Sequence, residues 1–371
     1  MAANRYLWIL ALALAVALST AAAAPSAHRA AGVNAFVVRG LVSDGSVVDT
    51  TVDPNLVNAW GLTSGPTTPW WVADNGTDKS TLYTGAGAKV AITVNVPGGP
   101  TGIVANAAGT GFVVSGGGRS GSARFIFATE AGEIRGWNPT VPTGPTPPSS
   151  ESELGSASDD GAIYKGLAIG TSGGNQYLYA ADFHNGVVEV YDSTFAEQDW
   201  DGAFVDPGIP AGFAPFGIQN LNGMIFVTYA KQDADAEDEI AGEGLGYVSA
   251  FGTDGSFLGR VASGGALNAP WGLAWAPLTD GHGHPGFGKF SGDLLVGNFG
   301  DGRINAFAWT GSGWEARGHL KTANHHPLSI DGLWGIGFGN GSGSGPITTL
   351  YFAAGPDDES HGLYGSVTSN N

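Results

Sequence analysis

The chain contains no cysteine, which excludes disulfide bonds, thiolate metal sites, cysteine nucleophiles and thiol-based redox chemistry. Basic residues are also scarce: 15 Lys and Arg stand against 33 Asp and Glu, so the formal net charge is −18 at pH 7. This charge argues against nucleic acids and anionic membranes as partners, because both would repel it. It is compatible with a cationic partner, with a metal ion, or with solubility alone.

Glycine, in contrast, is abundant, with 62 of 371 residues, and there are 20 prolines. Hydrophobic residues still make up 42% of the chain, which is enough to build a core without disulfides. Much glycine and many aromatic residues, with little Lys or Glu, favour short strands joined by tight turns. The composition therefore predicts an all-β protein.

Residues 1–24 have the pattern of a signal peptide. Arg5 precedes an apolar run at 7–18, and small residues follow at 19–24. A membrane anchor is the alternative, but this apolar run is short for a transmembrane helix. We expect cleavage, no membrane insertion of the mature chain, and secretion to an extracellular space such as a cell wall or apoplast. Residues 33–371 are expected to form one domain.

Three short motifs carry weak signals. Asn75 and Asn340 begin Asn-Gly-(Thr/Ser) triplets, which are acceptor sequences for N-glycosylation but are frequent by chance. Residues 170–174 match G-x-S-x-G formally. They lie in a glycine-rich turn between strands and not at a strand-to-helix elbow, so they give no support to a serine nucleophile.

Internal repeats are the most informative feature of the chain. A glycine followed by Leu or Ile and then by an apolar run recurs six times, at Trp60-Gly61-Leu62, Thr101-Gly102-Ile103, Lys165-Gly166-Leu167, Phe216-Gly217-Ile218, Trp271-Gly272-Leu273 and Asp331-Gly332-Leu333. After each glycine come a strand-like segment, a polar loop and usually another strand with alternating polarity. Each repeat is therefore predicted to be a small antiparallel meander.

Repeats of 40 to 60 residues with about four strands are typical of propeller blades. One such sheet cannot bury both of its faces, whereas six sheets around an axis bury each blade against its neighbours. The sequence therefore predicts a six-bladed β-propeller. The last repeat ends one strand short, and residues 35–42 form a strand-like run before the first repeat. We expect this N-terminal strand to complete the sixth blade and close the ring.

The repeats resemble NHL-repeat propellers and the gluconolactonase and strictosidine-synthase-like propellers. A narrower resemblance, to an uncharacterised family of secreted propellers, rests on several longer strings: residues 55–62 (NLVNAWGL), 180–186 (AADFHNG), 229–233 (YAKQD), 297–307 (GNFGDGRINAF), 330–334 (IDGLW) and 359–363 (ESHGL). They cover nearly all of the mature chain. The narrower resemblance implies the propeller fold and no particular activity.

The lactonase-type relatives hold a divalent cation at one mouth of the channel. The resemblance implies that Asn, Asp and Glu ligands stand just before the inner-strand glycines. The residues at those positions here are Trp60, Thr101, Lys165, Phe216, Trp271 and Asp331. Only Asp331 could serve as a ligand, and Lys165 argues against this type of metal site.

Polar loops after the second strand of each repeat offer better candidates, because equivalent loops of a propeller emerge on one face around the axis. The candidate rim residues are Asp74, Glu130, Asp182, His184, Lys231, Asp233, Asn298, Asp331, Glu359 and His361. Carboxylate and amide oxygens suit calcium or another divalent cation, and Asp with His suits a transition metal or an acid–base pair. Asp182, His184, Glu359 and His361 are the central candidates for a metal site.

Turn chemistry is the competing explanation for many of these residues. Asp, Asn and Gly are favoured in tight turns whatever the function, and this explanation is preferred for Asn75, Asn185 and Asp301. It does not account for His, Lys or Glu in such loops. The acidic run at residues 233–238 has Asp where a calcium-binding helix-loop-helix motif needs Gly, so a solvated loop is expected there.

Three functions remain open at this point, and no catalytic residue is identified. The working hypothesis is a secreted propeller that binds a small ligand, a glycan or a divalent cation at the polar rim. The first alternative is a metal-dependent hydrolase of a lactone or ester, or a polysaccharide lyase, using the same rim. The second is an extracellular scaffold that binds a protein partner. Propellers host all three functions, so the fold does not choose among them.

Overall fold

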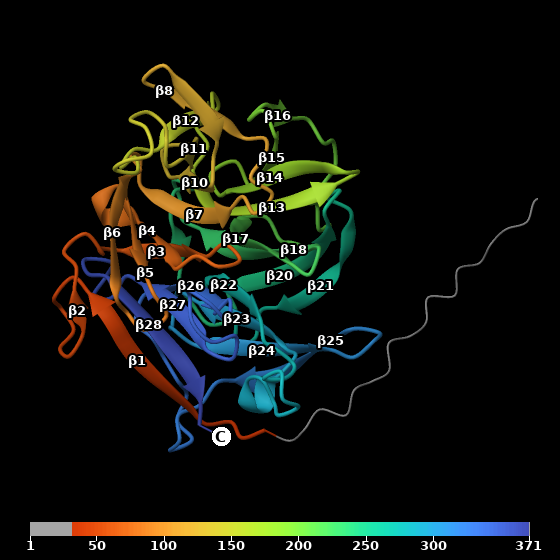
Figure 1. The fold of residues 1–371 in the computed structure, drawn as a ribbon. Helices are drawn as coiled ribbons and strands as arrows, with labels where there is room; N and C mark the ends of the chain where they lie inside the picture. Colours follow the sequence, from red (N-terminus) through yellow and green to blue (C-terminus); the bar gives the residue numbers. More distant parts are fainter. Residues whose placement is uncertain (1–31, 371) are drawn as a thin grey trace, which may run out of the picture.

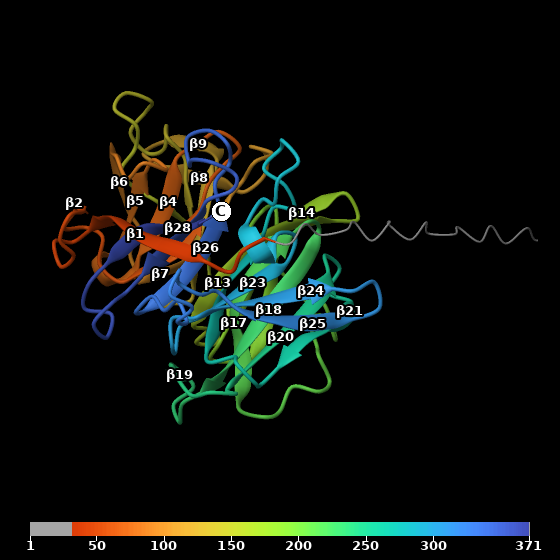
Figure 2. The same cartoon turned by 90° about the horizontal axis from the view of Figure 1, so that it is seen from below.

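Six antiparallel sheets are arranged around one axis in the computed structural model, which describes residues 32–370 (Figures 1 and 2). The six-bladed propeller predicted from the repeats is confirmed. The predicted signal peptide, residues 1–24, lies outside the described residues. Within residues 32–370, no helix has the length and apolar character needed to cross a membrane.

The blades are numbered in chain order and their strands are given from the axis outwards. Blade 1 comprises β3 (Ala59–Thr63), β4 (Trp70–Asp74), β5 (Lys79–Tyr83) and β6 (Lys89–Asn95), with a 3-10 turn η1 (Asn75–Thr77). Blade 2 comprises β7 (Pro100–Ala105), β10 (Phe125–Thr129), β11 (Glu133–Trp137) and β12 (Glu153–Ala157), with an inserted hairpin β8 (Val113–Gly116) and β9 (Arg119–Ser122). Blade 3 comprises β13 (Tyr164–Ser172), β14 (Asn175–Asp182), β15 (Val187–Asp192) and β16 (Glu197–Gln198).

The other three blades follow the same plan. Blade 4 comprises β17 (Phe213–Leu221), β18 (Met224–Gln232), β20 (Gly246–Gly252) and β21 (Phe257–Ser263), and the short β19 (Glu239–Ile240) pairs with β18. Blade 5 comprises β22 (Pro270–Trp275), β23 (Leu294–Asn298), β24 (Ile304–Trp309) and β25 (Trp314–His319), with a 3-10 turn η2 (Gly288–Phe290). Blade 6 comprises β26 (Leu333–Phe338), β27 (Leu350–Ala354), β28 (Leu363–Ser369) and β1 (Phe36–Ser43), edged by β2 (Thr51–Val52).

The ring is closed by β1, which lies antiparallel beside β28 as the sequence predicts (Figure 1). Their register runs from Phe36 opposite Ser369 to Ser43 opposite Leu363, with a bulge between Gly40 and Val42. The first and last described strands thus share one sheet, so separating them would break a ladder of backbone hydrogen bonds. This arrangement joins the two ends of the ring and removes an exposed edge.

Glycine brings the inner strands of neighbouring blades into close contact. A Cβ atom at Gly61 would lie 2.3 Å from the carbonyl oxygen of Thr101 in the next blade, and one at Gly217 would lie 2.1 Å from that of Trp271. Real Cβ atoms do not approach backbone this closely. The narrow centre of the propeller therefore requires glycine at these positions.

The sixth glycine of this ring is Gly335, which corrects the prediction of Gly332. A Cβ at Gly335 would lie 2.6 Å from the carbonyl oxygen of Trp60, so Gly335 joins blade 6 to blade 1. Gly332 has a φ of +61° and serves a turn before β26, where a Cβ would meet the carbonyl oxygen of Gly355 in its own blade. Both glycines precede an aliphatic or aromatic run, and only the strand register separates them. The sixth repeat is therefore Trp334-Gly335-Ile336.

Replacing Gly335 by Ala should lower the free energy of unfolding by about 1–3 kcal/mol, because the new methyl group overlaps the backbone of blade 1. The matched control is Gly313→Ala, where a Cβ meets nothing within 4 Å, and it should change stability by less than about 0.5 kcal/mol. Urea denaturation followed by tryptophan fluorescence measures both variants. Equal stabilities for the two variants would contradict the assignment of Gly335 to the inner ring.

Candidate functional site

An aromatic plug fills one mouth of the channel, at the face where the inner strands begin. Trp60, Trp271 and Trp334 are the second residues of β3, β22 and β26. Trp334 is fully buried and stacks on Trp60 at a ring-centroid distance of 3.7 Å and on Phe299 at 4.1 Å, while Trp271 meets it edge-on at 5.8 Å. Phe216 from β17 packs on Trp334 at 5.6 Å. These rings give the mouth an apolar floor.

Lys165, the second residue of β13, lies beside this plug and is only 1% exposed. Its Nζ is 2.6 Å from Glu130 Oε1 and 3.2 Å from Asp238 Oδ1, and it lies 5.1 Å from the centre of the Trp60 ring. Burial lowers the pKa of Lys165, but the neighbouring carboxylates, Glu130 first, outweigh burial and leave the pKa above its usual value. The lysine therefore remains a buried cation.

Glu130 is linked to the plug through two asparagine side chains. Asn75 Nδ2 donates to Glu130 Oε2 at 2.8 Å, and Asn58 Nδ2 donates to Asn75 Oδ1 at 3.2 Å. Asn58 Oδ1 in turn accepts from Trp60 Nε1 at 2.9 Å. The chain of hydrogen bonds fixes the carboxylate of Glu130 next to Lys165, so this part of the mouth is preorganised.

Two further carboxyl groups complete the cluster. Burial, with smaller contributions from the charges of Glu359 and Asp238, raises the pKa of Glu239 to about 8, although Lys165 opposes the shift. Burial likewise raises the pKa of Glu359, whose Oε1 is buried without a hydrogen-bond partner among the described residues. We call Glu130, Lys165, Asp238, Glu239 and Glu359 together the acidic mouth. It sets four carboxyl groups around one ammonium group.

Only part of the acidic mouth was foreseen from the sequence. Glu130 and Glu359 were among the predicted rim residues, and the structure brings both to Lys165. Asp238 and Glu239 come from the acidic loop that was expected to be solvated; the Asp238 side chain is 75% exposed, yet it contacts the buried lysine. The available signal was Lys165 itself, because a charged residue beside the axis needs partners of opposite charge.

Asp182, another predicted ligand, lies in a different place, between blades 2 and 3. Its carboxylate accepts from the backbone N–H of Ile163 and from Asn185, and it is fully buried. Oxygens of Asp160, Asp182 and Glu189 lie within 4.8 Å of one another. Among the described residues this is the one group of three acidic or histidine side chains so closely placed.

Glu189 is the second buried member of that carboxylate group, after Asp182, and is 8% exposed. Its Oε2 accepts from the hydroxyl groups of Tyr164 and Tyr191. Burial raises the pKa of Glu189 to about 7, and the charge of Asp182 adds to the shift. Glu189 Oε1 has no hydrogen-bond donor within residues 32–370, so it is available to a cation.

Asp74 and Asn298 also point between blades and not towards the axis. They end β4 and β23, as Asp182 ends β14, and both are fully buried. Asn298 Nδ2 donates to the carbonyl oxygen of Ala266 and to Asp301, whereas neither carboxylate oxygen of Asp74 has a hydrogen-bond partner in the described part of the chain. Burial holds the pKa of Asp74 well above its usual value.

His184, Lys231 and Asp233 surround the base of the acidic loop. His184 Nδ1 contacts the carbonyl oxygen of Ala236 at 3.2 Å, and the backbone of Lys231 pairs with Ile240. Asp233 Oδ1 accepts from the Glu237 backbone N–H within the loop. These residues support the loop that carries Asp238 and Glu239 to the axis.

His361 and Asp331 make local contacts at the edge of the same face. His361 Nδ1 lies 2.7 Å from Asp44 Oδ2, and this hydrogen bond raises the pKa of His361. Asp331 accepts from the backbone N–H of Asp357. The four central metal candidates therefore do not converge: Asp182 joins Glu189, His184 contacts the acidic loop, His361 contacts Asp44, and Glu359 alone faces Lys165.

The two candidate glycosylation sites use their amide nitrogens in hydrogen bonds. Asn75 Nδ2 donates to Glu130, and Asn340 Nδ2 donates to the carbonyl oxygens of Gly65 and Thr68. A glycan on either nitrogen would replace a donor of these bonds. For Asn75 the turn explanation is incomplete, because its side chain belongs to the network at the acidic mouth.

The axial cation site of lactonase-type propellers does not fit this chain. With the sixth glycine corrected to Gly335, the residue that precedes it is Trp334 and not Asp331. None of the six residues that precede the inner-strand glycines is then acidic. The ammonium group of Lys165 lies among the carboxylates there, so the chain supplies its own cation at this mouth.

Comparison with curated proteins finds two relatives that match along most of their length. The chain is 34% identical over 350 residues to the uncharacterized protein L690 of Acanthamoeba polyphaga mimivirus, covering 90% of this chain and 86% of that protein. It is 32% identical over 347 residues to the uncharacterized protein R648 of the same virus, covering 90% and 80%. No protein-family model matches the sequence.

Comparison with solved structures shows the fold alone, because sequence identities are low. A Bacteroides thetaiotaomicron protein of unknown function has a TM-score of 0.54 at 10% identity, covering 90% of this chain and 76% of that one. The soluble aldose sugar dehydrogenase of Escherichia coli has a TM-score of 0.50 at 14% identity, covering 90% and 100%. A streptogramin B lyase has a TM-score of 0.50 at 13% identity, covering 90% and 97%.

Stability should depend on pH through Glu239, and the sign follows from its raised pKa. The folded state keeps Glu239 protonated up to about pH 8, whereas the unfolded chain releases this proton near the usual glutamate pKa. The contribution of Glu239 to the free energy of unfolding is therefore fully present below about pH 4.5 and is lost as pH rises through about 8. Glu239→Gln should lose less stability than the wild type between pH 5 and pH 8.5 in urea denaturation.

The control for this measurement is Glu243→Gln, an exposed glutamate four residues further along the same segment. It should follow the wild-type pH dependence. The assignment of a protonated Glu239 to the acidic mouth would be contradicted if the free energy of unfolding changed with pH equally in the wild type, Glu239→Gln and Glu243→Gln.

Proposed function

This chain belongs to the family of the mimivirus proteins L690 and R648, and we propose that it is a binding protein that takes a small organic cation at its acidic mouth. We also propose that it acts outside the cell; the signal-peptide pattern of residues 1–24 supports this location. The fold alone does not select a function. The proposal rests on the chemistry of the acidic mouth.

One observation carries the proposal: the acidic mouth holds more carboxyl groups than its single lysine can balance. Lys165 contacts Glu130 and Asp238, which leaves Glu239 and Glu359 without a cationic partner in direct contact among residues 32–370. Both have raised pKa values, and Glu359 Oε1 is buried without a donor. A buried carboxyl group in this state is stabilised by an incoming positive charge that can also donate hydrogen bonds.

An organic ammonium ion suits this site better than a metal ion does. Its N–H groups can donate to Glu359 and Glu239, and its alkyl part can pack on an indole ring of the aromatic plug such as the half-buried Trp271. Aromatic rings beside carboxylates are the surroundings in which proteins hold such cations. Lys165, whose Nζ lies over the Trp60 ring and between Glu130 and Asp238, is an internal example of the same arrangement.

Ethanolamine, cadaverine and putrescine are suitable probes, with sodium chloride at equal ionic strength as the reference. At least one of the amines should raise the Tm of the purified protein, because a ligand that binds only the native state adds about 2.7 kcal/mol at 100 times its Kd. Glu359→Gln should weaken the binding about tenfold, through loss of a charge-assisted hydrogen bond. Differential scanning fluorimetry measures the change in Tm, and calorimetric titration measures the change in Kd.

Glu243→Gln again provides the matched control and should bind as the wild type does. The rise in Tm caused by the amines should also grow between pH 6 and pH 9, since the pKa of Glu239 is about 8 and this carboxyl group must be ionised to hold a cation. Equal responses to the amines and to sodium chloride, or an unchanged affinity in Glu359→Gln, would refute an organic-cation site at this mouth.

A second candidate function is favoured by a separate observation, the carboxylate group of Asp160, Asp182 and Glu189. Three carboxylates within 4.8 Å, one with a free oxygen, are suitable ligands for a hard cation such as calcium. We propose this place, between blades 2 and 3, for the divalent cation. The surrounding tyrosines, Tyr164 and Tyr191, hold Glu189 in position.

Calcium should raise the Tm of the wild type and a chelator should reverse the effect, whereas Glu189→Gln should abolish both responses. The stabilisation should be larger at pH 8 than at pH 6, because the pKa of Glu189 is about 7 and calcium binds the ionised form. The variant keeps an acceptor for Tyr164 and Tyr191, so its fold is preserved. No difference between calcium and sodium in the wild type would exclude the site.

A further inference from the structure

The opposite mouth of the channel, where the inner strands end, holds three adjoining cavities. Their volumes are about 370, 570 and 460 Å³, each within the range of small-ligand sites. Gln219 and Asn220 line both the first and the second, and Asn220 also lines the third. The cavities therefore form one continuous depression around the end of β17, to which all six blades contribute. We call it the neutral mouth.

The lining of the neutral mouth carries no charge. None of the residues around the three cavities is Asp, Glu, Lys, Arg or His, although the chain has 33 acidic residues. Amide and hydroxyl groups take their place, from Gln219, Asn220 and Asn222 in blade 4 and from Thr63 and Ser64 in blade 1. Such groups can both donate and accept hydrogen bonds without a net charge.

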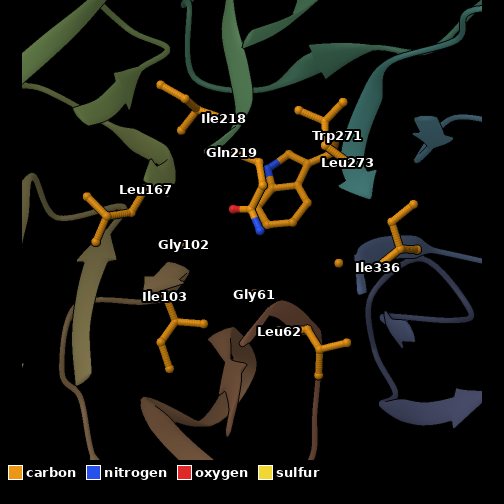
Figure 3. Close-up of a pocket in the computed structure, with 11 residues that line it drawn as sticks. Gly61, Leu62, Gly102, Ile103, Leu167, Ile218, Gln219, Trp271, Leu273 and Ile336 are labelled. Atoms are coloured by element: carbon orange, nitrogen blue, oxygen red, sulfur yellow. The ribbon is translucent and has the colours of Figure 1, made fainter. Parts of the chain in front are cut away.

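Gln219 is the polar group best placed to meet a ligand. It is half-buried, its side chain projects towards the channel axis, and its carboxamide has no hydrogen-bond partner among residues 32–370 (Figure 3). Asn220 differs, because its amide is held by the carbonyl oxygen of Ile169 and by the Gly223 N–H. The free carboxamide thus offers two donors and an acceptor at the centre of the neutral mouth.

An apolar collar separates the neutral mouth from the acidic mouth. It is formed by the residue that follows the glycine of each inner strand, namely Leu62, Ile103, Leu167, Ile218, Leu273 and Ile336 (Figure 3). The space inside it is about 20 Å³, enough for one water molecule. A ligand therefore cannot pass along the axis, and the two mouths are independent sites.

Aromatic rings complete the wall. Trp275 ends β22 and Phe338 ends β26; both are half-buried and line the cavity that Gln219 lines. The face of an aromatic ring carries negative potential and attracts polarised C–H groups. A neutral ring compound with many hydroxyl groups on its rim and C–H groups on its faces matches both parts of this lining.

We propose that the neutral mouth binds an uncharged oligosaccharide, with the Gln219 carboxamide bonded to sugar hydroxyls and Trp275 and Phe338 packed on sugar faces. An anionic polysaccharide would gain no counter-charge here and would be repelled by the protein as a whole. A cationic ligand would find no carboxylate. This site is distinct from the acidic mouth, and its occupancy does not depend on the function proposed there.

The experiment uses an array of neutral oligosaccharides, including maltohexaose, cellohexaose, xylohexaose and mannohexaose, with polygalacturonate and heparin as charged comparators. At least one neutral sugar should bind the wild type. Gln219→Ala should weaken that binding about tenfold in calorimetric titration, the effect of losing hydrogen bonds worth about 1.4 kcal/mol. Gln198→Ala, on the outer strand β16, is the matched control and should bind normally.

A second variant tests whether the loss of binding in Gln219→Ala comes from the neutral mouth and not from a change in structure elsewhere. Thr63→Val keeps the shape of the side chain and removes one hydroxyl of the neutral mouth, so it should also weaken sugar binding, whereas Glu359→Gln should leave it unchanged. The proposal is overturned if no neutral oligosaccharide binds, if only the acidic polysaccharides bind, or if Gln219→Ala and Thr63→Val bind the sugar as tightly as Gln198→Ala does.

Discussion

The close contact of six inner strands is the constraint on which the rest of the structure depends. At each glycine of the ring the backbone of one blade meets the backbone of the next, with no room for a Cβ atom. The strands can therefore pack tightly around the axis, and the space left inside the apolar collar is only about 20 Å³. The residues on either side of each glycine then decide what each mouth of the channel contains.

Those flanking residues give the two mouths different chemistry. The residues before the glycines bring Trp60, Trp271 and Trp334 together as a floor and place Lys165 beside it. The residues after the glycines form an apolar collar, and the strand ends beyond it carry amides and hydroxyls. One end of the propeller is thus rich in carboxylates and the other has no charge around its cavities.

The buried lysine explains how a propeller of this kind can hold several carboxyl groups near its axis. Taking a carboxylate out of water is unfavourable unless a cation compensates it. Lys165 compensates Glu130 and, across the mouth, Asp238 from the exposed loop. Burial raises the pKa of Glu359 and brings that of Glu239 to about 8, so the folded protein keeps Glu239 neutral near pH 7. That imbalance is what a positively charged ligand would relieve.

The fold could be predicted from the sequence because each blade contains a repeat. A mistake in assigning one repeat does not affect the assignment of the other five. A wrong glycine in the sixth repeat did not alter the number of blades, and the strand-like run at residues 35–42 was enough to predict the closure by β1. The strand register within a repeat was harder to predict from the sequence. Gly332 and Gly335 are three residues apart, and the structure distinguishes them by the contact of Gly335 with Trp60 in blade 1 and by the positive φ of Gly332.

The site was harder to predict, for two physical reasons. Asp74, Asp182 and Asn298 end equivalent strands, and the pleat of the strand turns their side chains between blades, a direction that the loop position does not reveal. Asp238 and Glu239 lie on an insertion, whose path over the mouth depends on contacts such as that between His184 and Ala236. Glu130 and Glu359 were found because they stand in loops where turn chemistry does not call for glutamate.

The central claim is that the acidic mouth takes a positive charge and that this charge ionises Glu239. Calorimetric titration of the purified protein with putrescine at pH 7, in two buffers with different enthalpies of ionisation, tests it most directly. The account predicts that the observed enthalpy differs between the buffers, because binding releases a proton from Glu239. Binding without proton release, or no binding heat in either buffer, would contradict it.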